Sequence, residues 1–573
     1  MTWLLRSIVD LFNGLAAWYY RRKFGAAARQ LGRGPSEEDD RRGFIIIEID
    51  GLAHDHLRNA LKQGTMPSLA RLIRSRALRL ACWRCGLPST TPASQAGIMY
   101  GNNWDIPGFR WYDKAAGESV VCRLPGPVRA IQDRISAGRA GLLRGGSSYT
   151  NMFDGDARLA LFTVSAMGRE RLFENVRGLG FLILFGLSPG RVFKVIGLSL
   201  WTWLAYVAKR TVAMIVPSTP LFTFWGPVQQ IASDIIFREV TTFSVMLDVY
   251  RGMPAVYASY TGYDEIAHHF GAESREALRA LRGIDRQVRQ IARIRELYVR
   301  RPYDLYVLSD HGLTQSEPFS RAHGQTLQEL MAEETGDEVR SGRQGQDGEG
   351  LSESRIHFML DELRGLEARP HSPWLARRLQ RSRQRLEDRL AIEVMASEWD
   401  LSRRGDTVVR SSGSLSHVYF NVTPSQMSLS EITLLCPDLL GRLVEHEGIE
   451  VVIGREDQEV IVAGKGGTVR LGPQGARSEG ENPLLTYDKP EWAAGQIARL
   501  ARFPHSGDLI LLGAWDGERV ISFEEQVATH GGLGGPQERP FIAYSARERL
   551  SARGIENSEE LYSRLVSAYR EYS

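Results

Sequence analysis

Two apolar runs, the first of them rich in β-branched residues and each ending in an acid, dominate the hydrophobic pattern of this chain. Residues 43–51 read GFIIIEIDG and residues 303–312 read YDLYVLSDHG. Apolar runs of this length predict strands that are buried on both faces, as in a parallel sheet. A strand of this kind presents the residues that follow it at the carboxyl edge of the sheet. We therefore expect Asp50, Asp310 and His311 at that edge.

Three shorter motifs add side chains that bind metals or act as nucleophiles. The motif YTGYDEIAHHFG places Asp264 and His268 four residues apart, on one face of a helical turn. The motif THGG holds His530 next to glycines that let the backbone approach closely. Residues 87–94, LPSTTPAS, offer hydroxyls at a strand-to-helix turn. Carboxylate and imidazole ligands together favour a borderline metal such as zinc.

Taken in order, these motifs resemble the alkaline phosphatase superfamily, and most closely its type I phosphodiesterase / nucleotide pyrophosphatase branch. The shared order is an Asp, a Thr within PSTTPA, then D-x-x-x-H, D-H-G and H-G, over residues 44–532. One such motif is a weak signal, whereas five in this order are specific together. The resemblance implies a three-layer α/β fold with a central mixed sheet, helices on both faces and metals at the carboxyl ends of the strands.

The resemblance also implies two divalent metal ions, for which zinc is the expected identity. In that family one ion is held by residues that match Asp50, Asp310 and His311, together with the nucleophile. The other is held by residues that match three further positions: Asp264, His268 and His530.

The expected nucleophile is Thr91, through a phospho-threonine intermediate that water then hydrolyses. A threonine hydroxyl is a poor nucleophile at neutral pH because it is protonated, and a dication stabilises its alkoxide. Thr90 is the rival nucleophile, but the register of PSTTPA in the family pattern favours Thr91. For the seven site residues taken together, a purely structural role is the minor alternative.

One feature departs from the family pattern. Nucleotide pyrophosphatases carry an asparagine about twenty residues after the nucleophile, where it contacts the phosphoryl oxygens. Here that region places Trp111 and Tyr112, whereas Asn102 and Asn103 come earlier. The sequence therefore assigns no residue to the phosphoryl contact.

Four other histidines are weaker candidates for the metal site. His269 is adjacent to His268 and so lies on a different helix face. We expect His54 and His56 to face solvent, and the sequence leaves His323 open between the site and an ordinary loop.

Length and composition agree with a large α/β enzyme. The chain has 573 residues, of which 43% are hydrophobic, and a formal net charge of +3. This charge argues against a nucleic-acid partner, which normally requires a strong basic field. The four cysteines do not form a disulfide framework. Cys82 and Cys85 have no second pair with which to bind zinc, so we expect them to be packing residues.

Two regions suggest contact with a membrane. In residues 1–42, the first 25 are apolar at helical spacing and end in basic residues, as in a helix that lies on a membrane surface, before a polar linker. An insertion at 175–230 holds apolar stretches of 13 and 14 residues, too short to span a bilayer. Tryptophan and tyrosine beside basic residues there suit the headgroup zone. The alternative for both regions is packing against the protein itself.

The catalytic domain is expected to cover residues 43–573. A second insertion, at 333–475, begins with a polar loop, continues with a basic helix and ends in a small α+β block. The apolar insertion at 175–230, placed as a cap between metal motifs, suggests a lipid or lipid-linked phosphate ester as substrate.

The sequence thus predicts a membrane-associated, two-metal phosphodiesterase or phosphatase, peripheral or monotopic. The first alternative is a soluble nucleotide pyrophosphatase or phosphomonoesterase. The second is a metal-binding scaffold on a membrane, without turnover. The sequence does not assign the side of the membrane on which the protein works.

Overall fold

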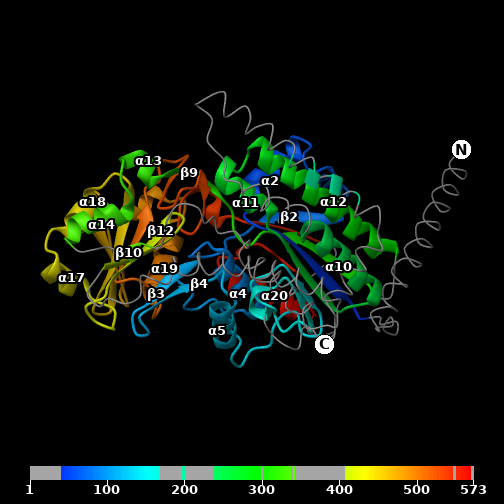
Figure 1. Cartoon of the computed structure of the whole chain (residues 1–573), viewed down its shortest axis with the longest axis horizontal. Helices are drawn as coiled ribbons and strands as arrows, with labels where there is room; N and C mark the ends of the chain where they lie inside the picture. The colour runs from blue at the N-terminus through cyan, green and yellow to red at the C-terminus, as the bar shows by residue number, and fades with distance from the viewer. Residues whose placement is uncertain are drawn as a thin grey trace, which may run out of the picture.

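The computed structural model of the chain describes residues 41–167, 237–297, 301–336, 340–341, 407–545 and 550–569, together with six single positions between 193 and 203. Two lobes lie side by side (Figure 1). One lobe is built on a seven-stranded sheet and the other on an eight-stranded sheet.

The seven-stranded sheet is mixed. β1 (Gly43–Ile49) lies at its centre, between β7 (Ala255–Tyr260) and β8 (Tyr303–Leu308), and runs parallel to both. The order is β2–β20–β8–β1–β7–β5–β6, completed by β2 (Leu78–Cys82), β20 (Phe541–Ser545), β5 (Ser147–Tyr149) and β6 (Leu159–Leu161). β20 is antiparallel to β8 and to β2. The two apolar runs are therefore neighbouring buried strands, as their composition predicts.

Side chains alternate along β1 between two hydrophobic cores. Ile45, Ile47 and Ile49 belong to one core, and Phe44 and Ile46 to the other. The first core is covered by α2 (His54–Lys62), α3 (Pro67–Arg74), α10 (Arg238–Arg251), α11 (Gly262–Phe270) and α12 (Arg275–Leu297). The second is covered by α4 (Thr91–Tyr100), α5 (Pro125–Ile135) and α20 (Ser558–Tyr569). Burying each such aliphatic side chain stabilises the fold by about 1.5–3 kcal/mol, and the predicted α/β architecture is confirmed.

Helix α4 is buried along its whole length. Its polar residues are buried together with its apolar ones, and α20 packs directly against it. Gly97 permits this contact, since a Cβ there would lie 2.0 Å from the Oγ of Ser558. The helix ends at Gly101, whose φ of 63° is left-handed and suits glycine. A helix enclosed on all sides holds its first residue, Thr91, in a fixed place.

The eight-stranded sheet is antiparallel except at its first pair. Its order is β10 (Arg340–Ser341), β11 (Thr407–Ser412), β12 (Leu415–Phe420), β17 (Leu509–Gly513), β13 (Ile449–Glu456), β14 (Glu459–Gly464), β15 (Gly467–Gly472) and β16 (Gly475–Gly480). Helices α17 (Leu429–Leu435) and α18 (Leu439–Glu445) precede β13. Its strands β11 to β15 lie within the predicted insertion at 333–475, whereas β16 and β17 come from beyond residue 474.

The segment that carries His530 is held from two sides. The turn between β11 and β12 of the eight-stranded sheet contains Gly413, where a Cβ would lie only 1.8 Å from the carbonyl oxygen of His530. In a separate small sheet, β19 (Ala528–Thr529) pairs with β9 (Thr314–Pro318), so that Thr529 lies opposite Thr314. The residues before His530 and after His311 are therefore held together by one ladder.

Several predicted segments lie outside the described residues. These are nearly all of the 1–42 segment, most of the 175–230 insertion, and the basic helix with most of the polar loop in the 333–475 insertion. Among the helices that the structure describes, none is both long enough and apolar enough to cross a membrane.

Candidate metal centre

The two central strands deliver three site residues to one edge of the sheet. Asp50 directly follows β1, and its backbone N–H donates to the carbonyl of Tyr260 at 3.2 Å. Asp310 and His311 follow β8, the neighbouring strand. Parallel strands end at the same edge, so these side chains meet, as the sequence pattern predicts.

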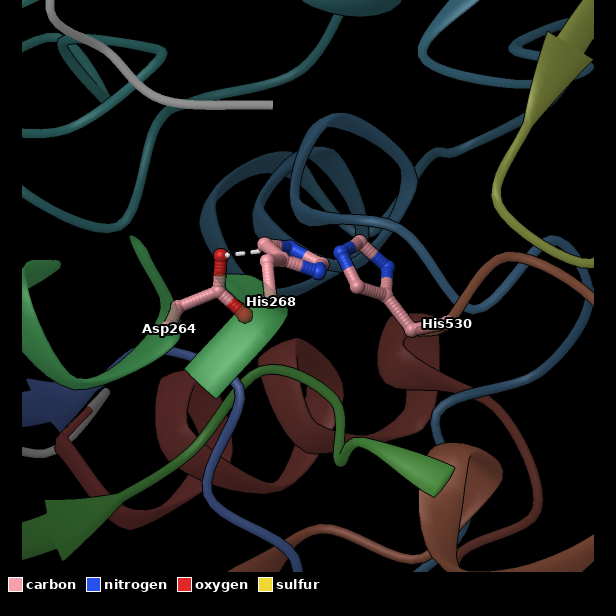
Figure 2. A group of neighbouring side chains, drawn as sticks. All are labelled: Asp264, His268 and His530. Atoms are coloured by element: carbon pink, nitrogen blue, oxygen red, sulfur yellow. Dashed lines mark ion pairs between the residues drawn. The ribbon is translucent and has the colours of Figure 1, made fainter. Parts of the chain in front are cut away.

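Helix α11 supplies the next two side chains. Asp264 and His268 lie one turn apart, and His268 Nε2 is 3.1 Å from Asp264 Oδ2 (Figure 2). Gly51 makes room for this helix, because a Cβ there would lie 2.2 Å from Asp264 Oδ1. Its φ of +70° is also left-handed, so glycine is required at this position on two grounds.

His530 approaches from the other end of the chain and completes the group. Figure 2 shows its imidazole beside that of His268, and their ring centroids are 5.2 Å apart. It also stacks on His311, with centroids 3.8 Å apart and an interplanar angle of 22°. Residues far apart in the sequence therefore converge at one place.

The six side chains form two groups with the geometry of metal sites. Asp264, His268 and His530 can each offer one ligand atom, and these atoms lie within 4.8 Å of one another. The second group meets the same criterion and consists of Asp50, Asp310 and His311. All six residues are buried.

Each of the three histidines is oriented by a backbone carbonyl. The Nδ1 atoms of His268, His311 and His530 lie 2.8, 3.0 and 2.8 Å from the carbonyl oxygens of Ala528, Gly312 and Ser89, respectively. A carbonyl only accepts a hydrogen bond, so each Nδ1 must carry the proton. In the neutral ring, Nε2 then has a lone pair, which is the arrangement that a metal ligand needs.

The carboxylates are held in an unfavourable electrostatic setting. Burial and the nearby charge of Asp310 raise the pKa of Asp50 well above its usual range. Burial and the charge of Asp264 raise the pKa of Asp310 to about 7. Burial opposes ionisation of Asp264 as well, but His268 outweighs it and lowers the pKa of that carboxyl below its usual range.

A divalent cation at each group would stabilise the charged form of these carboxylates. Asp264 Oδ1 is buried and has no hydrogen-bond partner among the described residues. Buried carboxylates crowded together are stable when a cation compensates their charge. Carboxylate and imidazole donors in these numbers fit two divalent ions.

The hydroxyl of Thr91 lies against the Asp50 group. Thr91 begins α4, and its Oγ1 is 3.0 Å from His311 Nε2 and 3.5 Å from Asp50 Oδ1. Thr90 is the residue before the helix; its Oγ1 is buried and has no hydrogen-bond partner in the part of the chain that the structure describes. Of the two hydroxyls, the one at Thr91 contacts candidate ligands.

The other histidines lie elsewhere. His269 is exposed, and His323 packs against Phe319 and His446, in neither metal group. His54 and His56 are partly buried, so the expectation that they face solvent is wrong. Both sit on α2, where the chain folds back against the loop before β20.

The asparagines and aromatic residues after the nucleophile contact other parts of the protein. Asn103 donates to Asn557 and Ser558, and Asn102 donates to the carbonyl of Ile135. Trp111 and Tyr112 are buried in the second core.

The prediction for the cysteines is half right. Cys85 is buried, whereas Cys82 is exposed because it ends the edge strand β2.

Two residues at the site went unnoticed in the sequence. Ser89 orients His530 through its carbonyl, and its Oγ donates to the carbonyl of Gly532 at 2.9 Å. Glu48 lies in β1, fully buried, two residues before Asp50. Burial and the charge of Asp310 raise the pKa of Glu48 to about 8. An acid inside an otherwise apolar strand was the available signal.

Comparison with known proteins agrees with this geometry. Residues 198–391 match the type I phosphodiesterase / nucleotide pyrophosphatase family. This segment contains Asp264, His268, Asp310 and His311 but not the other site residues. No curated protein matches the chain in sequence.

Three solved structures are similar to the chain over most of its length. The alkaline phosphatase PafA is 11% identical, with 93% of this chain and 96% of that one covered and a TM-score of 0.50. Phosphonoacetate hydrolase from Sinorhizobium meliloti 1021 is 16% identical, with coverages of 92% and 96% and a TM-score of 0.44. Murine ectonucleotide pyrophosphatase / phosphodiesterase 5 is 11% identical, with coverages of 92% and 95% and a TM-score of 0.40.

At such low identities a similar structure supports the fold alone. The likeness to PafA, with a TM-score of 0.50, gives that support. The family match over residues 198–391 adds the relation in sequence. The chain is thus similar in sequence, over residues 198–391, to the type I phosphodiesterases and nucleotide pyrophosphatases, and its fold is similar to that of the alkaline phosphatase PafA.

Proposed function

We propose that the protein is a two-metal phosphodiesterase or phosphatase in which Thr91 is the nucleophile. The observation that carries this proposal is the position of one hydroxyl against a buried ligand group that borders a second one. Thr91 Oγ1 lies 3.0 Å from His311 Nε2, and His311 in turn stacks on His530 of the other group.

The first ion would be held by Asp50, Asp310 and His311, with Thr91 as a further ligand. The second would be held by the other group: Asp264, His268 and His530. When bound, two divalent ions, for which we propose zinc, would lower the pKa of the Thr91 hydroxyl and neutralise charge on the phosphoryl group.

The reaction has two displacements at phosphorus. Thr91 Oγ1 bonds to phosphorus as the bond to the leaving oxygen breaks, and the leaving group departs as an alcohol with the proton that the hydroxyl gave up. Water then attacks the phospho-threonine, which restores the Thr91 hydroxyl and releases the second product. The enclosure of α4 supports this role, because it fixes the direction from which the hydroxyl attacks.

We further propose that the substrate is a lipid or lipid-linked phosphate ester at a membrane surface. Phe193, Ile196 and Leu200 are helical positions with exposed fractions of 73%, 56% and 57%. Their spacing of three and four residues puts them on one helix face, and we call them the apolar stripe. Large apolar side chains exposed together are typical of membrane or protein contacts. In the sequence, Phe193 is followed by Lys194, a basic residue of the kind that suits an anionic surface.

The nucleophile is tested with a matched pair of variants, Thr91→Ala and Thr90→Ala. With six protein ligands remaining, Thr91→Ala should retain both ions but lose turnover by several orders of magnitude. Thr90→Ala should be much milder. Metal content and hydrolysis of a nitrophenyl phosphodiester are measured together. An inactive Thr90→Ala beside an active Thr91→Ala would transfer the role to Thr90.

The substrate class is tested with a panel. Metal-loaded protein is assayed on nitrophenyl monoesters and diesters, nucleotides, phospholipids and polyprenyl phosphates. Preference for the lipid esters supports the proposal, whereas preference for nucleotides would favour a nucleotide pyrophosphatase. Tight metal binding with no turnover on any member would favour the non-catalytic scaffold.

A further inference from the structure

A cluster of polar side chains lies between the sheet and helix α4, behind the metal centre. Its members come from β1, α4, β7 and the loop after β5, and we call them the Glu48 cluster: Glu48, Gln95, Asn151, Tyr257 and Ser259. None of them is more than 2% exposed. Buried polar groups in such number are costly unless they are satisfied by one another.

Glu48 is the centre of this cluster. Its Oε1 accepts from Gln95 Nε2 at 2.6 Å and contacts the hydroxyl of Ser259, while its Oε2 accepts from the hydroxyl of Tyr257. Gln95 Nε2 also lies 3.1 Å from the Ser259 hydroxyl. The Asn151 amide closes the network, with Oδ1 2.6 Å from the same hydroxyl.

Gln95 ties its helix to two parts of the protein at once. Besides its contact with Glu48, its Oε1 accepts from the backbone N–H of Met152 at 2.8 Å. Met152 belongs to the loop after β5, so the amide connects α4 both to the central strand and to this loop. Both functional groups of this side chain are therefore used.

The cluster joins the strand and the helix that carry the reacting groups. Glu48 precedes Asp50 by two residues on β1, and Gln95 follows Thr91 by one helical turn. The contact between them is thus a short bridge between a candidate metal ligand and the nucleophile. A displacement of α4 along the sheet would move the Thr91 hydroxyl by a similar amount.

We propose that Gln95, through Glu48, is a positioning residue that holds the Thr91 hydroxyl in line with the substrate phosphorus. This inference rests on the proposed role of Thr91. A misplacement of about 1 Å at a reacting atom can lower a rate about a hundredfold. The side-chain hydrogen bonds of Gln95 go to Glu48, Ser259 and Met152, none of which is a candidate metal ligand. Its loss should therefore affect the chemical step more than substrate binding.

The first test is Gln95→Met, which keeps the volume and removes the bridge. We expect both ions to remain, KM to change less than about twofold, and kcat to fall about ten- to a hundredfold. Inorganic vanadate resembles the five-coordinate transition state, so its affinity by calorimetry should weaken by a similar factor. The affinity for inorganic phosphate should stay nearly unchanged.

Gln132→Met is the matched control. Gln132 is also buried and accepts from a backbone N–H, that of Asp154 at 3.0 Å, but it lies on α5 outside the Glu48 cluster. A merely structural role for Gln95 predicts that both variants lose stability and neither changes the ratio of vanadate to phosphate affinity.

The exchange of the two side chains gives a second, independent test. In the double variant Glu48→Gln, Gln95→Glu, the amide at position 48 can donate to the carboxylate at position 95, which still accepts from Met152. The single variant Gln95→Glu instead places two carboxyl groups together. The inference requires a low kcat for the single variant and recovery to within about fivefold of wild type for the double variant.

The outcomes separate this inference from the proposed function. An active wild type with unchanged kcat and vanadate affinity in Gln95→Met overturns the positioning role alone. If Gln95→Met does not fold, equal kcat values for the single and double exchange variants overturn it. A wild type that hydrolyses no phosphate ester overturns the proposed function itself.

Discussion

Gly413→Ala should damage the metal centre from the other lobe of the protein. Gly413 lies at the turn between β11 and β12 with a φ of +62°, and a Cβ there would stand 1.8 Å from the carbonyl oxygen of His530. The same Cβ would lie 2.4 Å from Thr529 Oγ1. Backbone atoms cannot rotate away as a flexible side chain can, so the segment that carries His530 must move.

The backbone conformation at Gly413 and the distance of the clash determine how large the effect of the substitution should be. The left-handed backbone itself costs an alanine about 1–2 kcal/mol. Relief of the clash requires the methyl group and the carbonyl to separate by about 1 Å more, and the imidazole of His530 moves with its backbone. A shift of this size at a reacting centre can cost about a hundredfold in rate. We expect lower stability, weaker binding of the second ion and a kcat reduced at least tenfold.

Metal content, chemical unfolding and hydrolysis of a nitrophenyl diester are measured on one preparation. Gly441→Ala is the control, because Gly441 is inside helix α18 and its added Cβ would meet nothing within 4 Å. That variant should keep wild-type activity and gain up to about 1 kcal/mol of stability. A Gly413→Ala protein with two ions and wild-type kcat would refute the reasoning.

Three further outcomes are expected. His530→Ala should fold and bind one ion rather than two, by elemental analysis, and chelation should abolish wild-type hydrolysis; two tightly held ions in this variant would contradict the ligand assignment. The hydrogen bond that His505 donates to Asp105 raises the pKa of His505 above its ordinary value of 6.5, so this pair stabilises the fold below pH 6.5 and loses that effect as pH rises through the raised pKa; unfolding curves of His505→Gln should lack this trend, and an unaltered pH profile would exclude it. Serine at the three positions of the apolar stripe should reduce co-sedimentation with anionic vesicles, whereas serine at Leu434, which is 84% exposed on α17, should not; equal binding by both variants would argue against a membrane contact at the stripe.

The sequence predicted the features that depend on neighbouring residues. The buried strand before Asp50 follows from a run of β-branched residues, and the placement of His268 over Asp264 follows from helical spacing. Resemblance to a family then supplied the connection between motifs that lie hundreds of residues apart. The α/β architecture was predicted on the same basis.

Features that depend on distant partners were not predicted. Nothing near Gly413 in the sequence indicates that its turn packs on His530, because the two meet only through the second sheet. Glu48 was read as part of an apolar strand, since its partners come from α4 and β7. Asn103 faces α20 for the same kind of reason: the helix that it contacts comes from the end of the chain.

The stacked rings of His311 and His530 have a consequence for how the protein acquires its ions. These rings belong to different ligand groups, yet they stack on each other with centroids 3.8 Å apart. The pairing of β9 with β19 also joins the backbone segments that carry them. Any shift that one ion causes in its own ring is therefore passed to the ring of the other site. By thermodynamic reciprocity, the change in affinity is the same in both directions. Titration of the metal-free protein should therefore depart from the curve of two independent sites.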